Sequence, residues 1–556
     1  MTTTATPASR TAHVRAAAAA TTRPPVVTVS LAPYAGPFER AQAWHLLRRA
    51  TFGATAARVD EAVALGLSGS LDRLVRPDGF AGLPLNVEGA GDPNVPVGQT
   101  WVEAPYVSGY DVNPYRQRSL RAWQMRSYRL GGFSAQARLS MFWHNHFGVA
   151  SDNADARLFY GYLATLRDGA LGSVRALLSA MTVDGAMLRF LNGNENVAGD
   201  PNENFARELL ELYTLGKGPA AGPGDYTTFT EDDVRAVARA LTGWTVRGIN
   251  STDPGVQPGP IFLPRRHDAT AKQLSARLGG ATIADAGAEE YERVLDVVFA
   301  QPTMGEYIVR KLYRYLVHYD VTPVVEDAIV RPLAAQLRAG GFEVAPVVRT
   351  LLGSAHFFEM YRRSAHISSP VEFALASTAA LATPIPDGDL RGEHQTMLAL
   401  ADACAAQQQT PSQPPTVAGW KAYYQAPLYD RTWISATTLA AREALTDQLT
   451  VNPWVVSRRL RIEADLLGLV AGFAEPDNPG ALIRELAERL FAEPLSPEQV
   501  TALKAILLPG LPDFEWTVEY NQHRGDPSDR ALAAGLEAKL RGLAAAMLTA
   551  AEAHLS

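Results

Sequence analysis

The chain lacks several features that would place it in a familiar class of protein. Its 556 residues include a single cysteine, Cys404, which excludes an intramolecular disulfide framework and a cysteine-based zinc knuckle. No apolar run approaches the roughly 20 residues that a membrane span needs. Basic residues number 51 against 58 acidic ones, so no broad positive field is present to attract nucleic acid. We therefore expect a soluble protein with no transmembrane segment and no nucleic-acid partner.

Two common catalytic signatures are also missing. The sequence contains neither the nucleophile elbow Gly-x-Ser-x-Gly nor the phosphate-binding loop Gly-x-x-x-x-Gly-Lys-Ser/Thr. What is present is an ordinary globular composition, with 47% hydrophobic and 20% charged residues. This is enough apolar surface to form a substantial core, which excludes disorder for most of the chain.

The first 35 residues differ from the rest. They are rich in Thr, Ala and Pro and show no periodic apolar pattern, so we predict a disordered tail over residues 1–35. The run Ala16–Ala20 is too short and too weakly apolar for the core of a signal peptide, although an atypical export signal is the alternative. The compartment is therefore left open.

From about residue 36 onward the spacing of apolar residues is helical. Ala41, Trp44 and Leu47 recur every third position, and similar stretches follow to the end of the chain. The pattern predicts an all-α fold, a large irregular multi-helix body with long ordered loops and at most a small β-hairpin. The short β-rich pieces that could form it are 26–31, 245–246 and 259–263. We expect a helical core over residues 36–370 that carries the functional site, and a C-terminal helical region over 371–556 packed on it.

The first candidate cluster lies in Phe142–Phe147, where His144 and His146 flank Asn145. Imidazoles two residues apart do not share a helix face, but where a helix ends both can point to one metal ion. The alternative is a pair of buried core histidines.

The second cluster follows Pro201 and contains Glu203, Arg207, Glu208 and Glu211 beside an apolar stripe. Carboxylates next to such a stripe are often half-buried, and half-buried carboxylates form ion pairs or bind a ligand. Spacings of four residues between Arg207 and Glu203 or Glu211 fit an ordinary solvated helix face equally well.

The third cluster is Arg265–Lys272, which includes His267 and Asp268 and follows a proline-rich loop. A histidine, a carboxylate and a lysine in irregular chain can serve as metal ligand, orienting group and anion holder. A turn held by local hydrogen bonds explains the same residues.

These clusters, in this order, resemble a bacterial family called domain of unknown function 1800. The similar stretches are 43–53, 142–147, 201–216, 230–244, 267–272 and 417–433, and the resemblance extends from about residue 37 to the end. It implies an uncharacterised protein whose relatives are often exported. Relatives are also often encoded beside a protein of the sulfatase/phosphatase-like kind, which implies a possible partner. The family has no established catalytic residues to carry over.

From the chemistry of the clusters we predict a metal-dependent enzyme, hydrolytic rather than redox, using Zn, Mn or Fe. The expected metal ligands are His144, His146, Glu203 and His267. We expect Glu208 or Glu211 to act as general base and Asn145 or Lys272 to stabilise an oxyanion. The expected substrate-binding residues are Arg207, Tyr213, Arg265 and Arg266.

Two other functions remain open at this stage. The first is a non-catalytic helical scaffold or partner-binding protein, in which the polar clusters are buried hydrogen-bond networks. The second is a metal-free enzyme like the helical polysaccharide lyases, in which Asn145, His146, Tyr213 and Arg207 supply the required residue types. A shared solvent-reachable pocket would favour an enzyme, and sealed clusters satisfied by local backbone would favour the scaffold.

Overall fold

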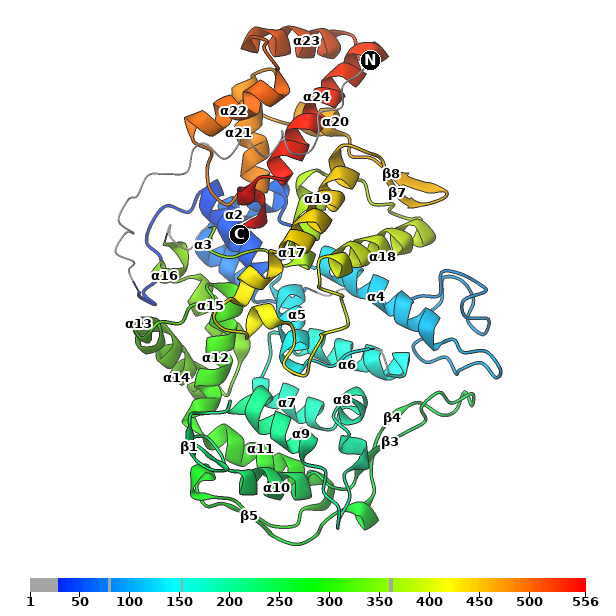
Figure 1. The fold of residues 1–556 in the computed structure, drawn as a ribbon, viewed down its shortest axis with the longest axis vertical. Helices are drawn as coiled ribbons and strands as arrows, with labels where there is room; N and C mark the ends of the chain where they lie inside the picture. The colour runs from blue at the N-terminus through cyan, green and yellow to red at the C-terminus, as the bar shows by residue number, and fades with distance from the viewer. Residues whose placement is uncertain (1–28, 79–81, 152–153, 360–363) are drawn as a thin grey trace.

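The computed structural model describes residues 29–78, 82–151, 154–359 and 364–556, and it is mainly helical, as the sequence predicted (Figure 1). Within these residues, no helix is both long enough and apolar enough to cross a membrane. The α-helices of the first part are α2 (Arg40–Ala50), α3 (Ala56–Leu74), α4 (Asn113–Arg129), α5 (Gln136–Phe147), α6 (Ala156–Asp168), α7 (Val174–Thr182), α8 (Gly185–Phe190), α9 (Glu203–Glu208), α10 (Glu231–Ala240), α11 (Glu290–Ala300), α12 (Pro302–Leu316), α13 (Pro323–Val325), α14 (Arg331–Ala339), α15 (Val344–Leu352) and α16 (Ala355–Phe358).

The remaining α-helices lie towards the end of the chain. They are α17 (Pro370–Ala380), α18 (Leu390–Ala406), α19 (Ala436–Thr450), α20 (Leu466–Ala471), α21 (Pro479–Leu490), α22 (Pro497–Leu507), α23 (Asp513–Gly525) and α24 (Arg530–Leu548). Two short π-helices, Leu209–Thr214 and Glu326–Val330, continue α9 and α13. Figure 1 places α20–α24 at one end of the long axis and α9–α11 at the other.

In the part of the chain that the structure describes, the β-structure is limited to four antiparallel two-stranded sheets. The predicted hairpin is formed by β3 and β4, with Trp244 opposite Phe262. The other three sheets were not predicted, because strands of two to four residues are too short to show a period-two pattern. The strands are β1 (Ala220–Gly222), β2 (Asp225–Tyr226), β3 (Trp244–Arg247), β4 (Gly259–Phe262), β5 (Lys272–Gln273), β6 (Thr282–Ile283), β7 (Trp454–Ser457) and β8 (Leu460–Ile462).

Helix starts follow the local sequence. The Thr230 hydroxyl accepts a hydrogen bond from the backbone of Asp233, whose carboxylate accepts one from the backbone of Thr230, which closes a capping box at α10. Ser496 caps α22 in the same way, with Pro497 in the first turn. Both start sites are readable from the sequence because capping depends only on neighbouring residues.

The disordered tail predicted over residues 1–35 falls mostly outside the described residues. Residues 1–28 lie outside the described part of the chain, whereas residues 29–35 lie against the segment around α16. The carbonyl of Ala32 accepts a hydrogen bond from Ala355, and Tyr34 donates one to Gly353. Val29 and Leu31 pack against the core. The prediction of disorder was therefore wrong for residues 29–35, because their partners lie more than 300 residues away in sequence.

Two clusters of buried apolar side chains organise the body. The larger one is built from residues between 43 and 358, and the smaller one mainly from residues between 371 and 548. The two are interleaved, because Phe52 and residues of α4 and α5 belong to the smaller cluster, while Trp420 and Trp433 belong to the larger one. The division at residue 370 stays a prediction.

A buried ion pair joins the two clusters. Arg138 of α5 is fully buried and pairs with Glu372 of α17. The Arg138 guanidinium lies over the rings of Phe52 and Tyr315, 5.2 and 4.7 Å from their centroids. Burial raises the pKa of Glu372, but Arg138 and the hydrogen bonds from Ser369 outweigh it and lower that pKa to about 2. Glu372 is therefore ionised at neutral pH, and each charge depends on the other.

Replacing Glu372→Gln leaves the Arg138 guanidinium buried without a counter-charge. We expect the free energy of unfolding at pH 7 to fall by about 3–5 kcal/mol, measured by urea unfolding. The pKa of Glu372 is lower in the folded than in the unfolded chain. Its contribution to the free energy of unfolding is therefore fully present above about pH 4.5 and is lost as the pH falls towards 2. The difference between wild type and variant should shrink over that range.

Asp327→Asn provides the control, since Asp327 forms an exposed helix-surface pair with Arg331. This variant should change stability by less than about 0.5 kcal/mol. A Glu372→Gln protein as stable as the Asp327→Asn protein would contradict the role assigned to the buried pair.

Candidate functional site

His144 lies inside the protein near the C-terminal end of α5. Its Nδ1 is 3.2 Å from the hydroxyl of Tyr162, and its ring packs edge-on against Trp420 with the centroids 5.7 Å apart. Its Nε2 has no hydrogen-bond partner among the described residues. Burial lowers the pKa of His144 to about 3, so the ring is neutral.

His146 faces different partners. Its Nε2 lies 3.1 Å from the carbonyl oxygen of Tyr213, and its Nδ1 lies 3.0 Å from Nζ of Lys311 on α12. Burial and the nearby Lys311 lower the pKa of His146 well below its ordinary value. Because a carbonyl oxygen only accepts, Nε2 carries the hydrogen and donates it to Tyr213. His144 and His146 therefore do not point to one metal ion.

Asn145 has a structural partner. Its side-chain oxygen accepts a hydrogen bond from the backbone of Trp420, 2.8 Å away. Gly419 has a positive φ of +86°, and a Cβ there would lie 2.3 Å from the backbone oxygen of Asn145. Asn145 thus holds the 416–420 segment against α5, and the expected role in stabilising an oxyanion is not supported by this geometry.

The carboxylates of the second cluster form ion pairs near the surface. Arg207 contacts Glu203 at 3.1 Å and Glu231 at 2.7 Å. Glu211 contacts Lys217 at 3.5 Å. Burial and the neighbouring Glu211 raise the pKa of Glu208. These contacts match the solvated-face alternative for Glu203 and Arg207.

Tyr213 is buried, and its hydroxyl donates to the carbonyl of Phe147 at 3.0 Å. Asn145 and His146 are buried as well. The lyase-like alternative needs these three side chains at a surface that substrate can reach, so their burial does not favour it. The single metal-compatible group in the described part of the chain includes none of His144, His146 and Glu203. The expected convergence of the first two clusters on a metal is thus not seen.

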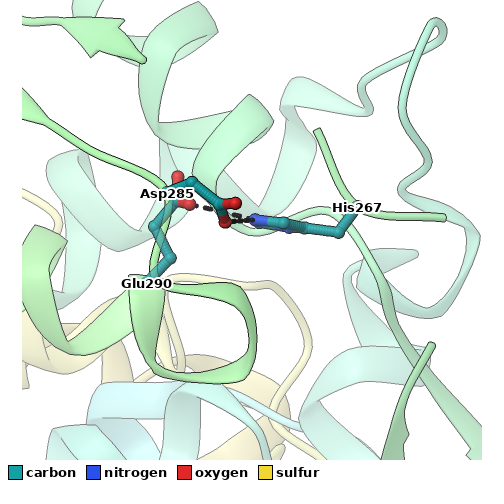
Figure 2. A group of neighbouring side chains, drawn as sticks. All are labelled: His267, Asp285 and Glu290. Carbon is teal, nitrogen blue, oxygen red and sulfur yellow. Dashed lines mark hydrogen bonds and ion pairs between the residues drawn. The ribbon is translucent and has the colours of Figure 1, made fainter. Parts of the chain in front are cut away.

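The third cluster does assemble a possible metal site. Among the described residues, His267, Asp285 and Glu290 bring one ligand atom each within 4.8 Å of one another (Figure 2). His267 Nε2 is 2.9 Å from Glu290 Oε2 and 3.5 Å from Asp285 Oδ1. Glu290 is fully buried and the side chain of His267 is 4% exposed, whereas that of Asp285 is 48% exposed. The group therefore opens to solvent on the Asp285 side.

Local structure brings these three residues together. β5 pairs with β6, with Lys272 opposite Ile283, so the segment after His267 lies beside the segment before Asp285. Glu290 is the first residue of α11, which begins just beyond. Gly243 has a φ of +98°, and a Cβ there would lie 3.1 Å from the Cβ of His267, so only glycine permits this close approach.

Hydrogen bonding orients the imidazole of His267. Its Nδ1 lies 2.9 Å from the carbonyl oxygen of Thr242 and 3.2 Å from the Thr242 hydroxyl. The hydroxyl donates at 2.7 Å to the carbonyl of Arg239, so Nδ1 carries the hydrogen that reaches the Thr242 carbonyl. The lone pair of Nε2 then faces two carboxylates. A cation is needed between them, either a proton on the ring or a metal ion.

Lys272 is also fully buried and forms an ion pair with Glu290, and it donates to the carbonyl of Asp268. Lys272 therefore balances the charge of Glu290. Because its ammonium group is engaged in this ion pair, the geometry does not support the expected role in stabilising an oxyanion. Arg266 donates to the carbonyl of Asn194 at 2.9 Å, and Arg265 is exposed. Substrate binding by Arg265 and Arg266 stays a prediction.

Sequence reasoning identified His267 but missed Asp285 and Glu290. Glu290 lies in a run of acidic residues at the start of a helix, where the helix dipole alone explains negative charge. Asp285 lies in a loop 18 positions after His267. The sequence around Asp285 and Glu290 shows a helix start, and a helix start alone does not identify a metal ligand.

Comparison with known proteins identifies a family without a known activity. Searches of curated proteins and of solved structures gave no match. A family model described as protein of unknown function, DUF1800, matches residues 45–545. This match covers nearly the whole chain and contains all three clusters described above. The chain therefore belongs to the DUF1800 family.

Proposed function

We propose that this protein is a divalent-metal-dependent enzyme of hydrolytic type whose metal ligands are His267, Asp285 and Glu290. One observation carries the proposal: Nε2 of His267 faces two carboxylate oxygens, while Nδ1 is held by the Thr242 carbonyl. Metal-binding histidines are commonly oriented in this way by a second-shell carbonyl.

The donor set fits the proposed metals. One imidazole nitrogen and two carboxylate oxygens suit Zn, Mn or Fe. Three protein ligands leave a position free, and a divalent metal with a free position supplies an activated water for hydrolysis. The exposed side of Asp285 gives solvent and substrate a route to that position. Lys272 limits the negative charge at the site by pairing with the other oxygen of Glu290.

A helical scaffold is the second candidate, favoured by the buried contacts around α5. Asn145 and His146 are each satisfied by backbone groups of distant segments, as expected of a network that holds the body together. The resemblance to relatives encoded beside sulfatase/phosphatase-like proteins supports a partner of that kind under either proposal.

The first test is metal binding by isothermal titration of the untagged protein with zinc and manganese salts. We expect about one ion per chain for wild type, and at least a tenfold weaker affinity for Asp285→Asn. Asp285→Asn is the cleanest variant, because this side chain is half exposed and its loss leaves no buried charge unpaired. Asp296→Asn, at a similarly exposed carboxylate, should bind like wild type. Well-folded wild type that binds neither metal would refute the proposal and favour the scaffold.

A second variant distinguishes the His267 group from the α5 histidines, which the sequence placed together in one metal site. His144→Phe removes an imidazole whose neighbours are the Tyr162 hydroxyl and the rings of Phe159 and Trp420, so we expect the metal affinity to stay within twofold of wild type. His267→Ala should reduce it at least tenfold. Loss of metal in His144→Phe, with the fold retained by circular dichroism, would place the site at α5 instead.

The third test concerns the reaction. We expect hydrolysis of at least one member of a panel of nitrophenyl esters, phosphates and glycosides. The activity should be abolished by a chelator, restored by added metal and reduced at least tenfold in Asp285→Asn. Hydrolysis that a chelator leaves unchanged would contradict a metal-dependent mechanism.

A further inference from the structure

A second unusual site lies where the π-helix Leu209–Thr214 ends against α5 and α12. The last carbonyl groups of a helix lack partners within the helix, and here side chains from other elements bind them. Tyr213 accepts from His146, and Leu212 accepts from the Tyr307 hydroxyl at 2.9 Å and from Lys311 Nζ at 3.2 Å. π-helices are rare and are frequently found at functional sites.

Lys311 differs from the other lysines of the chain, which has six in all. Lys421 is exposed. Lys311 is partly buried, and no carboxylate oxygen lies within 4 Å of its Nζ in the described residues. Its neighbours are an imidazole, a backbone carbonyl and the ring of Tyr307, whose centroid is 5.0 Å away. The other four pair with carboxylates: Lys217 with Glu211, Lys272 with Glu290, Lys504 with Asp513 and Lys539 with Glu519.

The hydrogen bonds match a neutral amine. His146 Nε2 donates to Tyr213, so its Nδ1 has a lone pair and accepts from Lys311. The carbonyl of Leu212 accepts a second hydrogen. A neutral amine has two hydrogens and one lone pair, so both hydrogens are bound and the lone pair is left free. The site holds the amine in a fixed orientation.

Burial and a neighbouring positive charge also favour the neutral form of Lys311. Burial, followed by the positive charge of Arg314, lowers the pKa of Lys311 to about 7. The titratable groups on the neighbouring elements include His146 on α5, Tyr307, Arg310 and Arg314 on α12, Glu208 at the end of α9, and Glu211 and Tyr213 on the π-helix. Glu211 and Arg310 have their own partners, Lys217 and Glu326.

We propose that Lys311 is a nucleophilic amine that condenses with the carbonyl group of a small aldehyde or ketone. The nitrogen lone pair forms a bond to the carbonyl carbon, and a proton passes from nitrogen to the carbonyl oxygen to give a carbinolamine. The hydroxyl then leaves as water with one further proton, and an imine of Lys311 remains. His146 Nδ1, 3.0 Å from the nitrogen, accepts a hydrogen bond from the amine and so helps to orient its lone pair.

This site is independent of the proposed metal site. Lys311 and Tyr307 are each partly exposed as whole residues, and the proposal requires that a small carbonyl compound enters between α12 and the π-helix to meet the amine. Lys272 differs from Lys311, because Lys272 is fully buried and its partner is the carboxylate of Glu290. A carboxylate partner favours the charged form, whereas an imidazole partner does not.

The test is competitive labelling of the folded wild-type protein with acetaldehyde and cyanoborohydride, with N-ethyl-lysine quantified at each site by peptide mass spectrometry. At pH 7 the neutral fraction of an amine with a pKa near 7 is roughly a thousandfold larger than that of an ordinary lysine. Allowing for partial burial, we expect Lys311 to react at least tenfold faster than the exposed Lys421. This advantage should shrink as the pH rises to 10.

Labelling of the unfolded protein in urea provides the reference, since all six lysines should then react at similar rates. Lys311→Arg should remove the fast-reacting site, and the matched control Lys421→Arg should leave it. Folded protein in which Lys311 reacts no faster than Lys421 at pH 7 would overturn the proposal, whether the cause is a charged amine or a closed site. Metal binding by Lys311→Arg should match wild type, so the two proposals fail or survive separately.

Discussion

The ion pair between Arg138 and Glu372 is the constraint on which the arrangement of this protein most depends. It lies where the two apolar clusters meet, and neither charge is tolerated in the interior without the other. Buried ion pairs are weak sources of net stability, but removing one member is costly. The pair therefore specifies how α5 meets α17 more than it strengthens the contact, and the rings of Phe52 and Tyr315 restrict the guanidinium further.

Because Arg138 fixes α5, it also fixes the residues at the end of that helix. His144, Asn145 and His146 follow two turns later, and each faces a different part of the body: α6, the 416–420 segment, and the α9 and α12 region. Three adjacent polar side chains thus connect segments that are distant in sequence. Their density predicted a metal site, but the α-helix continues to Phe147 and directs successive side chains about 100° apart. The two imidazoles could share a metal only if the helix had ended before them.

Two lysines, Lys272 and the less buried Lys311, show how the same side chain acquires different chemistry from its neighbours. Lys272 faces Glu290, and Lys311 faces His146. The first arrangement compensates a buried charge next to the His267 group, and the second favours loss of the charge. Both lysines would look equivalent in any list of residue types, and the difference arises entirely from which helix or strand lies opposite.

The sequence by itself determined the features that depend on neighbouring residues. These include the helical body, the helix starts at α10 and α22, the β-rich character of the segments that form β3 and β4, and the family, whose motifs are contiguous. It also identified His267 as a residue with possible metal chemistry. Only the tertiary structure decided that Asp285 and Glu290 join His267 while His144 and His146 diverge, and that Lys311 meets an imidazole. The physical reason is that helix periodicity and capping act over a few residues, whereas the direction and partner of a buried polar side chain are set by the packing of segments tens to hundreds of residues apart.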